Sequence, residues 1–417
     1  MKIKLKYDRG YQEIDFQSES NVSLIQASET TEACDEDEIM HKAIKNPIDS
    51  KRLRDIVKPG ETVAIVTSDI SRPMPSYKVL PFVISELYEA GLKDSNIKIV
   101  LALGSHRGHT EEEKIKLVGS KIYASNIDVI DSDMDDCVHL GTCKNKTPVD
   151  VFSQVVTADR VVCLGNIEYH YFAGYSGGAK AIMPGVSSRR AIQTNHKNML
   201  HEKARAACLD ENPVRQDIDQ VADFINIDFI VNLVLSPKKE ILGAFAGHVI
   251  QAHRAGCKFL DSVYGAKITT LYDIVILSPG GFPKDSNLYQ AQKGLANAVH
   301  AIKDGGTLIL LAAAKEGFGE DNFEKWMLNK SPKERVKDIS EDFILGGHKA
   351  AAIGQIQLNH TIIMVTDLRK EVVESCGFKY AIDLEGAVRM AFEEQGQSAK
   401  ILVMPTAGST LPKRSDG

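Results

Sequence analysis

Short apolar runs alternate with amphipathic segments along most of the chain. Residues 62–67 (TVAIVT) are all β-branched or apolar, and residues 75–91 carry apolar side chains at helical spacing up to Gly91. Runs of this kind, rich in β-branched residues, are typical of buried parallel strands, and their alternation with helices predicts an α/β sheet covered by helices. Further strands of this series are expected at 97–103, 127–131 and 160–166.

The pattern changes in the middle of the chain and then resumes. Residues 229–236 and 241–247 are separated by Pro237 and two lysines, which favours a hairpin, and a helix is expected over 249–263. A second α/β series follows, with strands at 272–281, 306–314, 361–367 and 399–408 and a helix near 289–303. We therefore predict an α/β protein of two domains with mostly parallel layered sheets and an active site in the interdomain cleft. The expected domains are residues 1–268, which bind a cofactor, and residues 269–417, whose last strand could pack back on the first domain.

Composition and charge narrow the classes of function. The 417 residues suit two or three domains, and 50 Lys and Arg against 56 Asp and Glu give a net charge of −6, so no basic field indicates nucleic-acid binding. The longest apolar stretches, such as 308–314, fall far short of the ~18 residues that span a membrane. The first residues alternate charged and apolar side chains, which predicts a strand and not a secretory signal. Seven cysteines without a C-x-x-C pair favour a reducing, cytoplasmic location.

Two candidate segments follow predicted strands of the first domain. Asp69 and Arg72 lie in a loop stiffened by prolines, where a guanidinium could bind a carboxylate or phosphate, although the two residues could simply brace the loop. His106 lies between the next strand and a helix and could transfer protons near neutral pH. His109 is equally close, and either histidine could instead bond a nearby carbonyl group.

The most unusual stretch is 165–185, GNIEYHYFAGYSGGAKAIMPG. Gly177 and Gly178 permit a positive φ and a close approach of the backbone to a ligand. Lys180 stands among small apolar residues, so its pKa could be lowered enough for it to act as a nucleophile. The stretch is neither a Walker A loop nor a G-x-G-x-x-G fingerprint, and a structural turn with a surface lysine remains the alternative.

Two helical positions complete the set of candidates. His196 falls late in a helix over 187–200, where it could equally be a solvated histidine. Gln290 and Lys293 are three residues apart on one face of a helix, so an amide and an ammonium could bind a carboxylate together, or form an ordinary polar face.

Together these segments resemble the nickel-pincer lactate racemase family. The resemblance rests on SDISRP (68–73), GSHRGH (104–109), EYHYFAGYSGGAKAIMPG (168–185), NH (195–196) and the Y-Q-x-x-K run (289–293), in this order. It implies a pyridinium-3-thioamide-5-thiocarboxylic acid mononucleotide that carries Ni(II) and is joined covalently to Lys180. The roles implied for the other residues are proton transfer by His106 and His170, nickel ligation by His196, cofactor contact by Asp69, Gly177 and Gly178, and substrate binding by Arg72, Gln290 and Lys293.

The resemblance also implies the reaction. A 2-hydroxy acid would lose its α-hydrogen as hydride to the cofactor, pass through a planar 2-keto acid, and regain the hydride on the other face, with a histidine on each side for proton transfer. Lactate, malate, an aryl-lactate or a sugar acid would suit this chemistry, so racemase and 2-epimerase both remain open. The implied partners are the small-molecule substrate and cofactor-maturation proteins, while the sequence leaves the oligomeric state undetermined. The alternatives are a nicotinamide-dependent dehydrogenase and a non-catalytic ligand-binding homologue.

Overall fold

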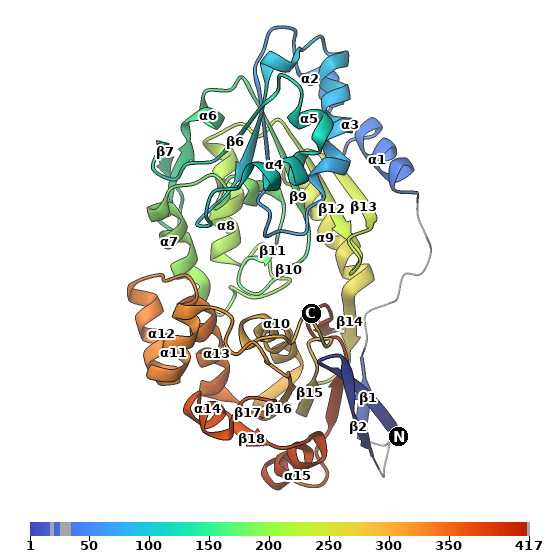
Figure 1. The fold of residues 1–417 in the computed structure, drawn as a ribbon, viewed down its shortest axis with the longest axis vertical. Coiled ribbons are helices and arrows are strands. Elements are labelled where there is room, and N and C mark those ends of the chain that lie inside the picture. The colour runs from blue at the N-terminus through green and yellow to red at the C-terminus, as the bar shows by residue number, and fades with distance from the viewer. Residues whose placement is uncertain (17–20, 26–34, 415–417) are drawn as a thin grey trace. The chain divides into compact units, whose positions relative to one another are not determined.

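The computed structural model describes residues 1–16, 21–25 and 35–414, and these form two compact units. One unit is made from the described residues within Thr31–Ser262, and the other from those within Met1–Thr30 and Val263–Gly417. Both are α/β units built on a mostly parallel sheet (Figure 1), which confirms the predicted fold class. Within the described ranges, no helix combines the length and apolarity needed to cross a membrane.

The larger unit contains a six-stranded sheet of order β13-β12-β9-β4-β5-β6. Its strands are β4 (Val63–Ser68), β5 (Ile97–Ala102), β6 (Asp128–Asp131), β9 (Arg160–Asn166), β12 (Phe229–Leu235) and β13 (Ile241–Gly247). The central strands are parallel, with Ile65 of β4 opposite Ile99 of β5 and Val162 of β9. Only β13 is antiparallel, which confirms the predicted hairpin with β12.

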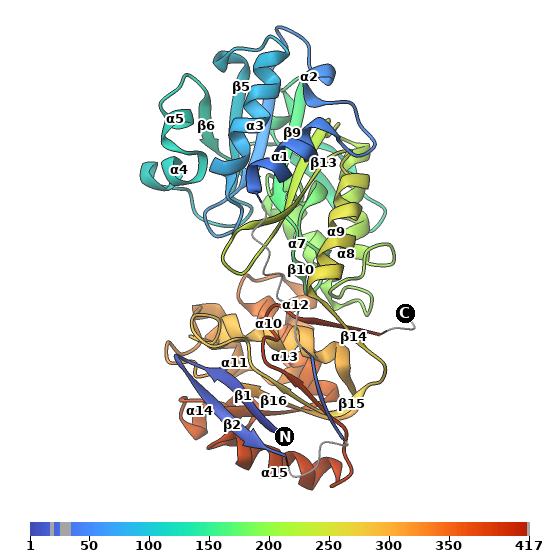
Figure 2. The same ribbon diagram turned by 90° about the vertical axis from the view of Figure 1, so that its right-hand side faces the viewer.

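Helices cover both faces of this sheet because its central strands are apolar on both sides. Figure 2 shows α1 (Glu36–Lys45) and α3 (Ser76–Glu89) in front of the sheet, where Met40, Val79 and Val83 join one buried cluster with strand residues such as Ile65. The remaining helical segments are α2 (Leu53–Ile56), η1 (Asp94–Asn96), α4 (Glu111–Val118), α5 (Ser120–Tyr123), α6 (Ser153–Val156), η2 (Gly178–Ala181), α7 (Arg189–Lys197), η3 (Asn198–Leu200), α8 (Pro213–Gln220), η4 (Val221–Asp223) and α9 (Gln251–Tyr264). Two short antiparallel pairs, β7 (Cys137–Thr142) with β8 (Pro148–Phe152) and β10 (Tyr169–His170) with β11 (Gly174–Tyr175), complete the unit.

The second unit contains a six-stranded, fully parallel sheet of order β18-β17-β16-β15-β19-β3. Its strands are β3 (Val22–Leu24), β15 (Tyr272–Leu277), β16 (Ile302–Leu311), β17 (Thr361–Val365), β18 (Lys379–Ala381) and β19 (Ile401–Met404). Its helical segments are α10 (Leu288–Ala298), η5 (Val299–Ala301), α11 (Asp321–Asn329), α12 (Pro332–Glu341), α13 (Gly347–Asn359), α14 (Lys370–Ser375) and α15 (Leu384–Gln395). An antiparallel hairpin of β1 (Lys2–Tyr7) and β2 (Gly10–Asp15) and a parallel pair of β14 (Gly265–Ile268) and β20 (Leu411–Arg414) belong to it as well.

The first residues of the chain belong to the second unit, and not to the first domain as the sequence suggested. We expected residues 1–268 to form one domain, but β3 pairs with β19 through Val22 and Ile401, and β1 and β2 pack in the same unit. The reason is non-local pairing, since a short strand completes whichever sheet edge accepts its backbone groups. The last strands also stay in this unit, because β19 pairs with β15 and β20 with β14.

Candidate functional site

Three of the candidate segments follow neighbouring strands of the larger unit. Strands β9, β4 and β5 lie side by side and parallel, so the loops after them start at the same edge of the sheet. That edge is where open α/β sheets place functional residues. The loop after β4 carries Asp69 and Arg72, the loop after β5 carries His106, and the segment after β9 carries His170 and Lys180.

Asp69 and His106 form the central contact between two of these loops. Nδ1 of His106 lies 2.8 Å from Oδ2 of Asp69, and the Ser71 hydroxyl lies 3.2 Å from the same nitrogen. Burial alone would raise the pKa of Asp69, but hydrogen bonds from His106 and Ser71 and the charge of Arg72 outweigh it and lower that pKa. An ionised Asp69 holds the proton of His106 on Nδ1, which leaves a lone pair on Nε2 for accepting a proton. Arg72 is half exposed, with Nε 4.0 Å from Asp69.

His109 has a bracing role that the sequence could not separate from catalysis. Its side chain is 1 % exposed; Nδ1 lies 2.6 Å from an Asp131 carboxylate oxygen and Nε2 accepts the Ile70 amide at 3.0 Å. With both ring nitrogens engaged, the ring ties the loop after β5 to the loop after β4. This arrangement leaves His106 as the histidine of this loop that can transfer protons.

The β10–β11 hairpin presents His170. Nδ1 of His170 accepts the Ala173 amide at 3.2 Å, so the neutral ring carries its proton on Nε2. The hydroxyl groups of Tyr169 and Tyr175 both donate to Oδ1 of Asp261 on α9, at 2.8 and 2.9 Å, which fixes the hairpin to that helix. The neutral His106 ring thus has a hydrogen-bond acceptor at Nε2, and the neutral His170 ring has a hydrogen-bond donor at the same position.

Lys180 lies on the short helical turn η2, directly after two glycines. Gly177 and Gly178 have φ of 80° and 62°, and a Cβ on either would lie 2.7 Å from an atom of Asn232 or Arg215 respectively. Contacts within the chain are thus sufficient to require glycine here, and the Gly178 amide donates to Oδ1 of Asn232 at 2.7 Å. Burial, followed by the charges of Arg72 and Arg215, lowers the pKa of Lys180 to about 7. A large fraction of its amine is therefore neutral and nucleophilic at neutral pH.

His196 lies near the end of α7, where it is 9 % exposed. Its ring packs edge-on against Phe172 at 4.9 Å, and Phe172 packs edge-on against His170 at 4.5 Å. The aromatic ring thus connects the predicted metal ligand to a predicted proton-transfer residue. Helix α8 holds α7 in place, because the side-chain Nδ2 of Asn195 donates to the backbone carbonyl of Val214 at 3.2 Å.

Gln290 and Lys293 lie in the other unit, near the start of α10. Asn287 caps this helix, because its side-chain oxygen accepts a hydrogen bond from the backbone N–H of Gln290 at 3.0 Å. Both predicted side chains are exposed, whereas the intervening Gln292 is buried. The helix therefore presents an amide and an ammonium to its surroundings, as the three-residue spacing predicted.

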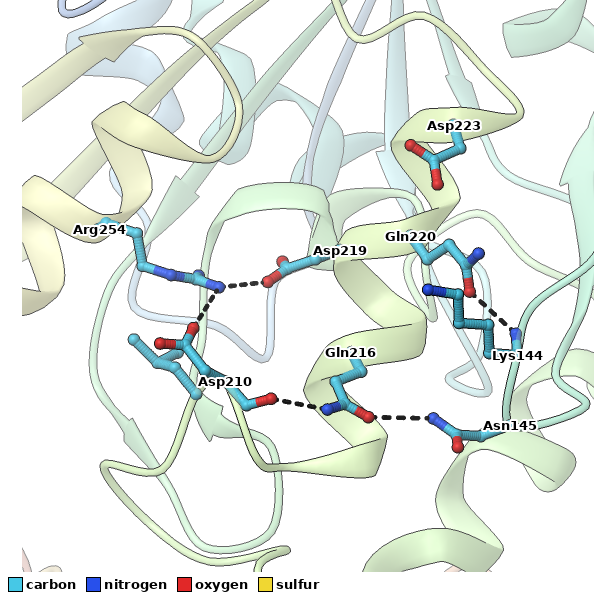
Figure 3. Close-up of a pocket in the computed structure, with 9 residues that line it drawn as sticks. Lys144, Asn145, Asp210, Gln216, Asp219, Gln220, Asp223 and Arg254 are labelled. Atoms are coloured by element: carbon cyan, nitrogen blue, oxygen red, sulfur yellow. Dashed lines mark hydrogen bonds and ion pairs between the residues drawn. The ribbon is translucent and has the colours of Figure 1, made fainter.

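Sequence reasoning missed the residues that support the Lys180 turn. Arg215, Asn232, His253 and Asp261 lie on α8, β12 and α9, and all four contact the segment 169–178. They are separated from that segment by tens of residues and belong to no motif, so nothing local in the sequence identified them. A pocket of about 380 Å³ opens beside two of their neighbours, Asp219 and Arg254 (Figure 3), and contains none of the predicted site residues.

Protein side chains alone do not form a metal site among the described residues. Within 1–16, 21–25 and 35–414, no three His, Cys, Asp or Glu side chains are grouped so that they could hold a metal ion. The six described cysteines are free thiols, and Cys34 lies outside the described residues.

Comparison with known proteins identifies the family. Residues 7–207 match the lactate racemase N-terminal domain, and residues 268–411 match the lactate racemase C-terminal domain. The chain belongs to the lactate racemase family. The resemblance inferred from the five motifs is thereby confirmed, and so is the predicted class of enzyme, an isomerase that acts on hydroxy acids.

Relatives of this lactate racemase family member cover nearly its full length. The lactate racemase of Thermoanaerobacterium thermosaccharolyticum is 35 % identical over 90 % of both chains, and that of Lactiplantibacillus plantarum is 31 % identical over 99 % of both. The solved apoprotein of the former superposes with a TM-score of 0.88 at 32 % identity, over 99 % of this chain and all of that one. A solved Thermotoga maritima protein shares the fold, with a TM-score of 0.64 at 18 % identity over 91 % of this chain and 98 % of its own.

Proposed function

We propose that this chain is a racemase or 2-epimerase of a 2-hydroxy acid that uses a nickel-pincer nucleotide joined to Lys180. The observation that carries the proposal is the environment of Lys180. A lysine whose pKa is lowered to about 7 follows a buried glycine turn, in the unit that also holds His106, His170 and His196. The sequences of these segments resemble the motifs of the family, and the relatives are named lactate racemase.

The bound nucleotide, with Ni(II), would supply a carbon that accepts and returns the α-hydrogen of the substrate as hydride. Lys180 would hold it through a thioamide bond, for which its neutral amine is the required form. His196 would provide one nickel ligand. A single imidazole cannot hold nickel alone, so the proposal requires the sulfur and carbon donors of the nucleotide to supply the other ligands.

The two histidines would move the hydroxyl proton. Nε2 of His106 has the lone pair to remove it while the α-hydrogen leaves, so that no dianion accumulates. In its neutral form, Nε2–H of His170 can donate a hydrogen bond to the substrate oxygen. After taking up a second proton from solvent, the His170 imidazolium would return a proton to the carbonyl oxygen of the 2-keto acid when the hydrogen comes back on the other face. General acid–base catalysis of this kind is worth roughly 10²–10⁴-fold for each residue. In the reverse direction the two rings exchange roles after proton exchange with solvent.

The remaining residues would bind the substrate carboxylate. Arg72 offers a planar fork of donors, and Gln290 and Lys293 offer an amide and an ammonium. These groups recognise the part that all 2-hydroxy acids share. Lactate, malate, aryl-lactates and sugar acids are therefore all candidates, and a chiral assay over this panel would identify the substrate.

The test compares the unchanged chain with Lys180→Ala after each has been produced under conditions that allow cofactor attachment. The full chain is produced together with nickel-pincer maturation proteins, and peptide mass spectrometry and chiral chromatography are applied to it and to Lys180→Ala. We expect a covalent addition on Lys180 in the unchanged chain, and loss of both the addition and the racemisation in the variant. Lys121→Ala removes an exposed lysine of the same unit and should retain both. Full activity of Lys180→Ala would refute the proposed attachment.

The route of the α-hydrogen is tested separately with a single enantiomer carrying deuterium on the α-carbon. Because the hydrogen is expected to leave and return without entering solvent, the product of opposite configuration should retain the label. Complete loss of deuterium to water at each inversion would indicate removal of the hydrogen as a proton, and would contradict this mechanism.

A further inference from the structure

The segment that leads into Lys180 is held by a buried arginine on α8. The Arg215 side chain is fully buried, and Nη1 donates to the carbonyl oxygens of Tyr175 and Gly177, both at 3.3 Å. Nη2 also reaches the Gly177 carbonyl, at 3.4 Å, and pairs with Asp219 at 2.9 Å. A guanidinium is always charged and offers five donors in a planar fork, so one side chain can engage several acceptors at once.

His253 on α9 holds the carbonyl group between those two. Its Nε2 donates to the Ser176 carbonyl at 2.9 Å, and its Nδ1 lies 3.2 Å from Nη2 of Arg215 and 2.9 Å from Nη1 of Arg254. Burial, followed by the charge of Arg215, lowers the pKa of His253 well below its ordinary value. The ring is therefore neutral, with a proton on Nε2 for the carbonyl and a lone pair on Nδ1 for the arginines.

Asn232 completes a set of contacts on consecutive peptide groups. Its Oδ1 accepts the Gly178 amide at 2.7 Å. The carbonyls of residues 175, 176 and 177 and the amide of residue 178 are thus all engaged by Arg215, His253 and Asn232, which we call the Arg215 cluster. The cluster packs closely against Gly178, because a Cβ there would lie 2.7 Å from Nη2 of Arg215 and 3.0 Å from the His253 ring.

The outer side of the Arg215 cluster is partly exposed at Asp219 and Arg254. Asp219 pairs with Arg215 and, at 2.6 Å, with Arg254, and both Asp219 and Arg254 line the pocket in Figure 3. Their side chains are 15 % and 21 % exposed. Asn has nearly the same size and shape as Asp, so Asp219→Asn removes the charge without leaving a cavity above the cluster.

We propose that Arg215 and His253 are positioning residues for Lys180: they fix the peptide groups of residues 175–177 so that the turn presents the Lys180 amine in one orientation for attachment of the cofactor. The identity of the group that Lys180 binds rests on the proposed function. The geometry of the turn is independent of that function. The charge of Arg215 also contributes to the lowered pKa of Lys180. One buried cation would thus set both where the amine points and how readily it loses its proton.

The experiment uses the full chain without cofactor, before and after Arg215→Gln. Hydrogen exchange of peptide 174–182 measures how firmly the turn is held, and acylation of Lys180 by acetic anhydride as a function of pH measures its titration. We expect at least tenfold faster exchange in this peptide with peptide 97–102 unchanged, and an acylation midpoint that rises from about 7 because a nearby positive charge is lost. Arg389→Gln, an exposed charge loss in the other unit, should change neither. Unchanged exchange at 174–182 in folded Arg215→Gln would overturn the proposal.

Asp219→Asn separates positioning from general packing. It keeps the guanidinium and its carbonyl contacts, so the acylation midpoint should stay at or below that of the unchanged chain. A rise toward the ordinary lysine value in Asp219→Asn as well would indicate a generally loosened structure and would also overturn the proposal. If Arg215→Gln does not fold, His253→Gln takes its place: faster exchange at 174–182 alone supports positioning, and unchanged exchange there refutes it.

Maturation supplies the final readout. When the variants are produced with the maturation proteins, the covalent addition on Lys180 should fall at least tenfold in Arg215→Gln and remain in Arg389→Gln. An undiminished addition in Arg215→Gln would overturn the positioning role. If the unchanged chain itself acquires no addition on Lys180, the proposed function fails, while the exchange and acylation results still decide whether the Arg215 cluster positions the amine.

Discussion

At the scale of single residues, the Asp69–His106 contact makes a specific prediction. Asp69 is 4 % exposed and keeps its charge at neutral pH because its pKa is lowered, so its carboxylate accepts the Nδ1 proton of His106. In Asp69→Asn the new amide can donate to Nδ1, which moves the ring proton to Nε2 and removes the base. We expect kcat for racemisation by the matured enzyme to fall roughly 10²–10⁴-fold. Asp135→Asn, an exposed change in the same unit, should leave kcat unaltered.

The covalent addition on Lys180 should survive in Asp69→Asn, which separates a loss of base catalysis from a loss of cofactor. Ionisation of Asp69 also has a definite pH dependence. A carboxyl group with a lowered pKa loses its charge only as the pH falls below its ordinary range, so Asp69 should not limit kcat near neutral pH. Normal kcat in matured Asp69→Asn would contradict the assigned tautomer.

At this scale, the sequence predicted features that depend on neighbouring residues and missed those that depend on residues far apart in the chain. Strand ends located Asp69, His106 and Lys180, because their positions follow from local hydrophobic patterns. The different roles of His106 and His109 depend on Ile70 and Asp131, which lie on other loops and strands. For the same reason Arg215 and His253 had no local signal, although between them they donate hydrogen bonds to the carbonyl groups of residues 175, 176 and 177.

At the scale of elements, the anchoring of α7 decides where His196 lies. Asp150 on β8 is 3 % exposed and accepts hydrogen bonds from Ser188, the N-cap of α7, at 2.5 Å and from Nε of Arg190 at 2.6 Å. Burial would raise the pKa of Asp150, but the bonds from Arg190, Ser188 and His139 lower it to about 2. We expect Asp150→Asn to reduce the free energy of unfolding at pH 7 by about 1–3 kcal/mol, since these bonds involve a charged acceptor.

The pH dependence of this loss has a definite sign. A carboxyl group whose pKa is lower in the folded protein stabilises it above the ordinary pKa, and that contribution is lost as the pH falls from about 4 toward about 2. Urea unfolding should therefore show a smaller difference between the unchanged chain and Asp150→Asn at pH 3 than at pH 7. Equal differences at the two pH values would show that the charge of Asp150 contributes nothing.

Element boundaries show where periodicity stops being informative. The hairpin of β12 and β13 was predictable because Pro237 interrupts two apolar runs. The helix expected near 289–303 ends at Ala298, and residues Val299–Ala301 form a 3₁₀ turn before β16 begins at Ile302. Apolar residues recur from Leu295 to Ile302 without a glycine or proline between them, so the sequence does not mark where the helix ends and the turn begins.

At the scale of the whole molecule, the sequence predicted two α/β units but not which unit holds the start of the chain. The alternating pattern of the first residues correctly indicated a strand, β1, which pairs with the adjacent β2, but the pattern does not say which sheet this hairpin packs against. Leu5 and Ile14 of the hairpin join a buried cluster with Ile274 and Val403, more than 250 residues away. Which sheet the hairpin covers depends on the apolar surface that the distant strands expose. The sequence around residue 5 carries no information about that surface.

This topology predicts that a substitution at the start of the chain destabilises its far end. Leu5 is fully buried on β1, and a large-to-small change at such a site costs about 2–5 kcal/mol, so Leu5→Ala should destabilise the unit formed with residues 263–414. Hydrogen exchange should accelerate in peptides from β15, β16 and β19 and remain unchanged in β4, β5 and β9. Tyr11→Ala, on the same hairpin but 62 % exposed, should change the exchange of neither unit. If Leu5→Ala instead accelerates exchange in β4 and β5, then the first strands stabilise the larger unit, and the assignment of the chain's start to the second unit is wrong.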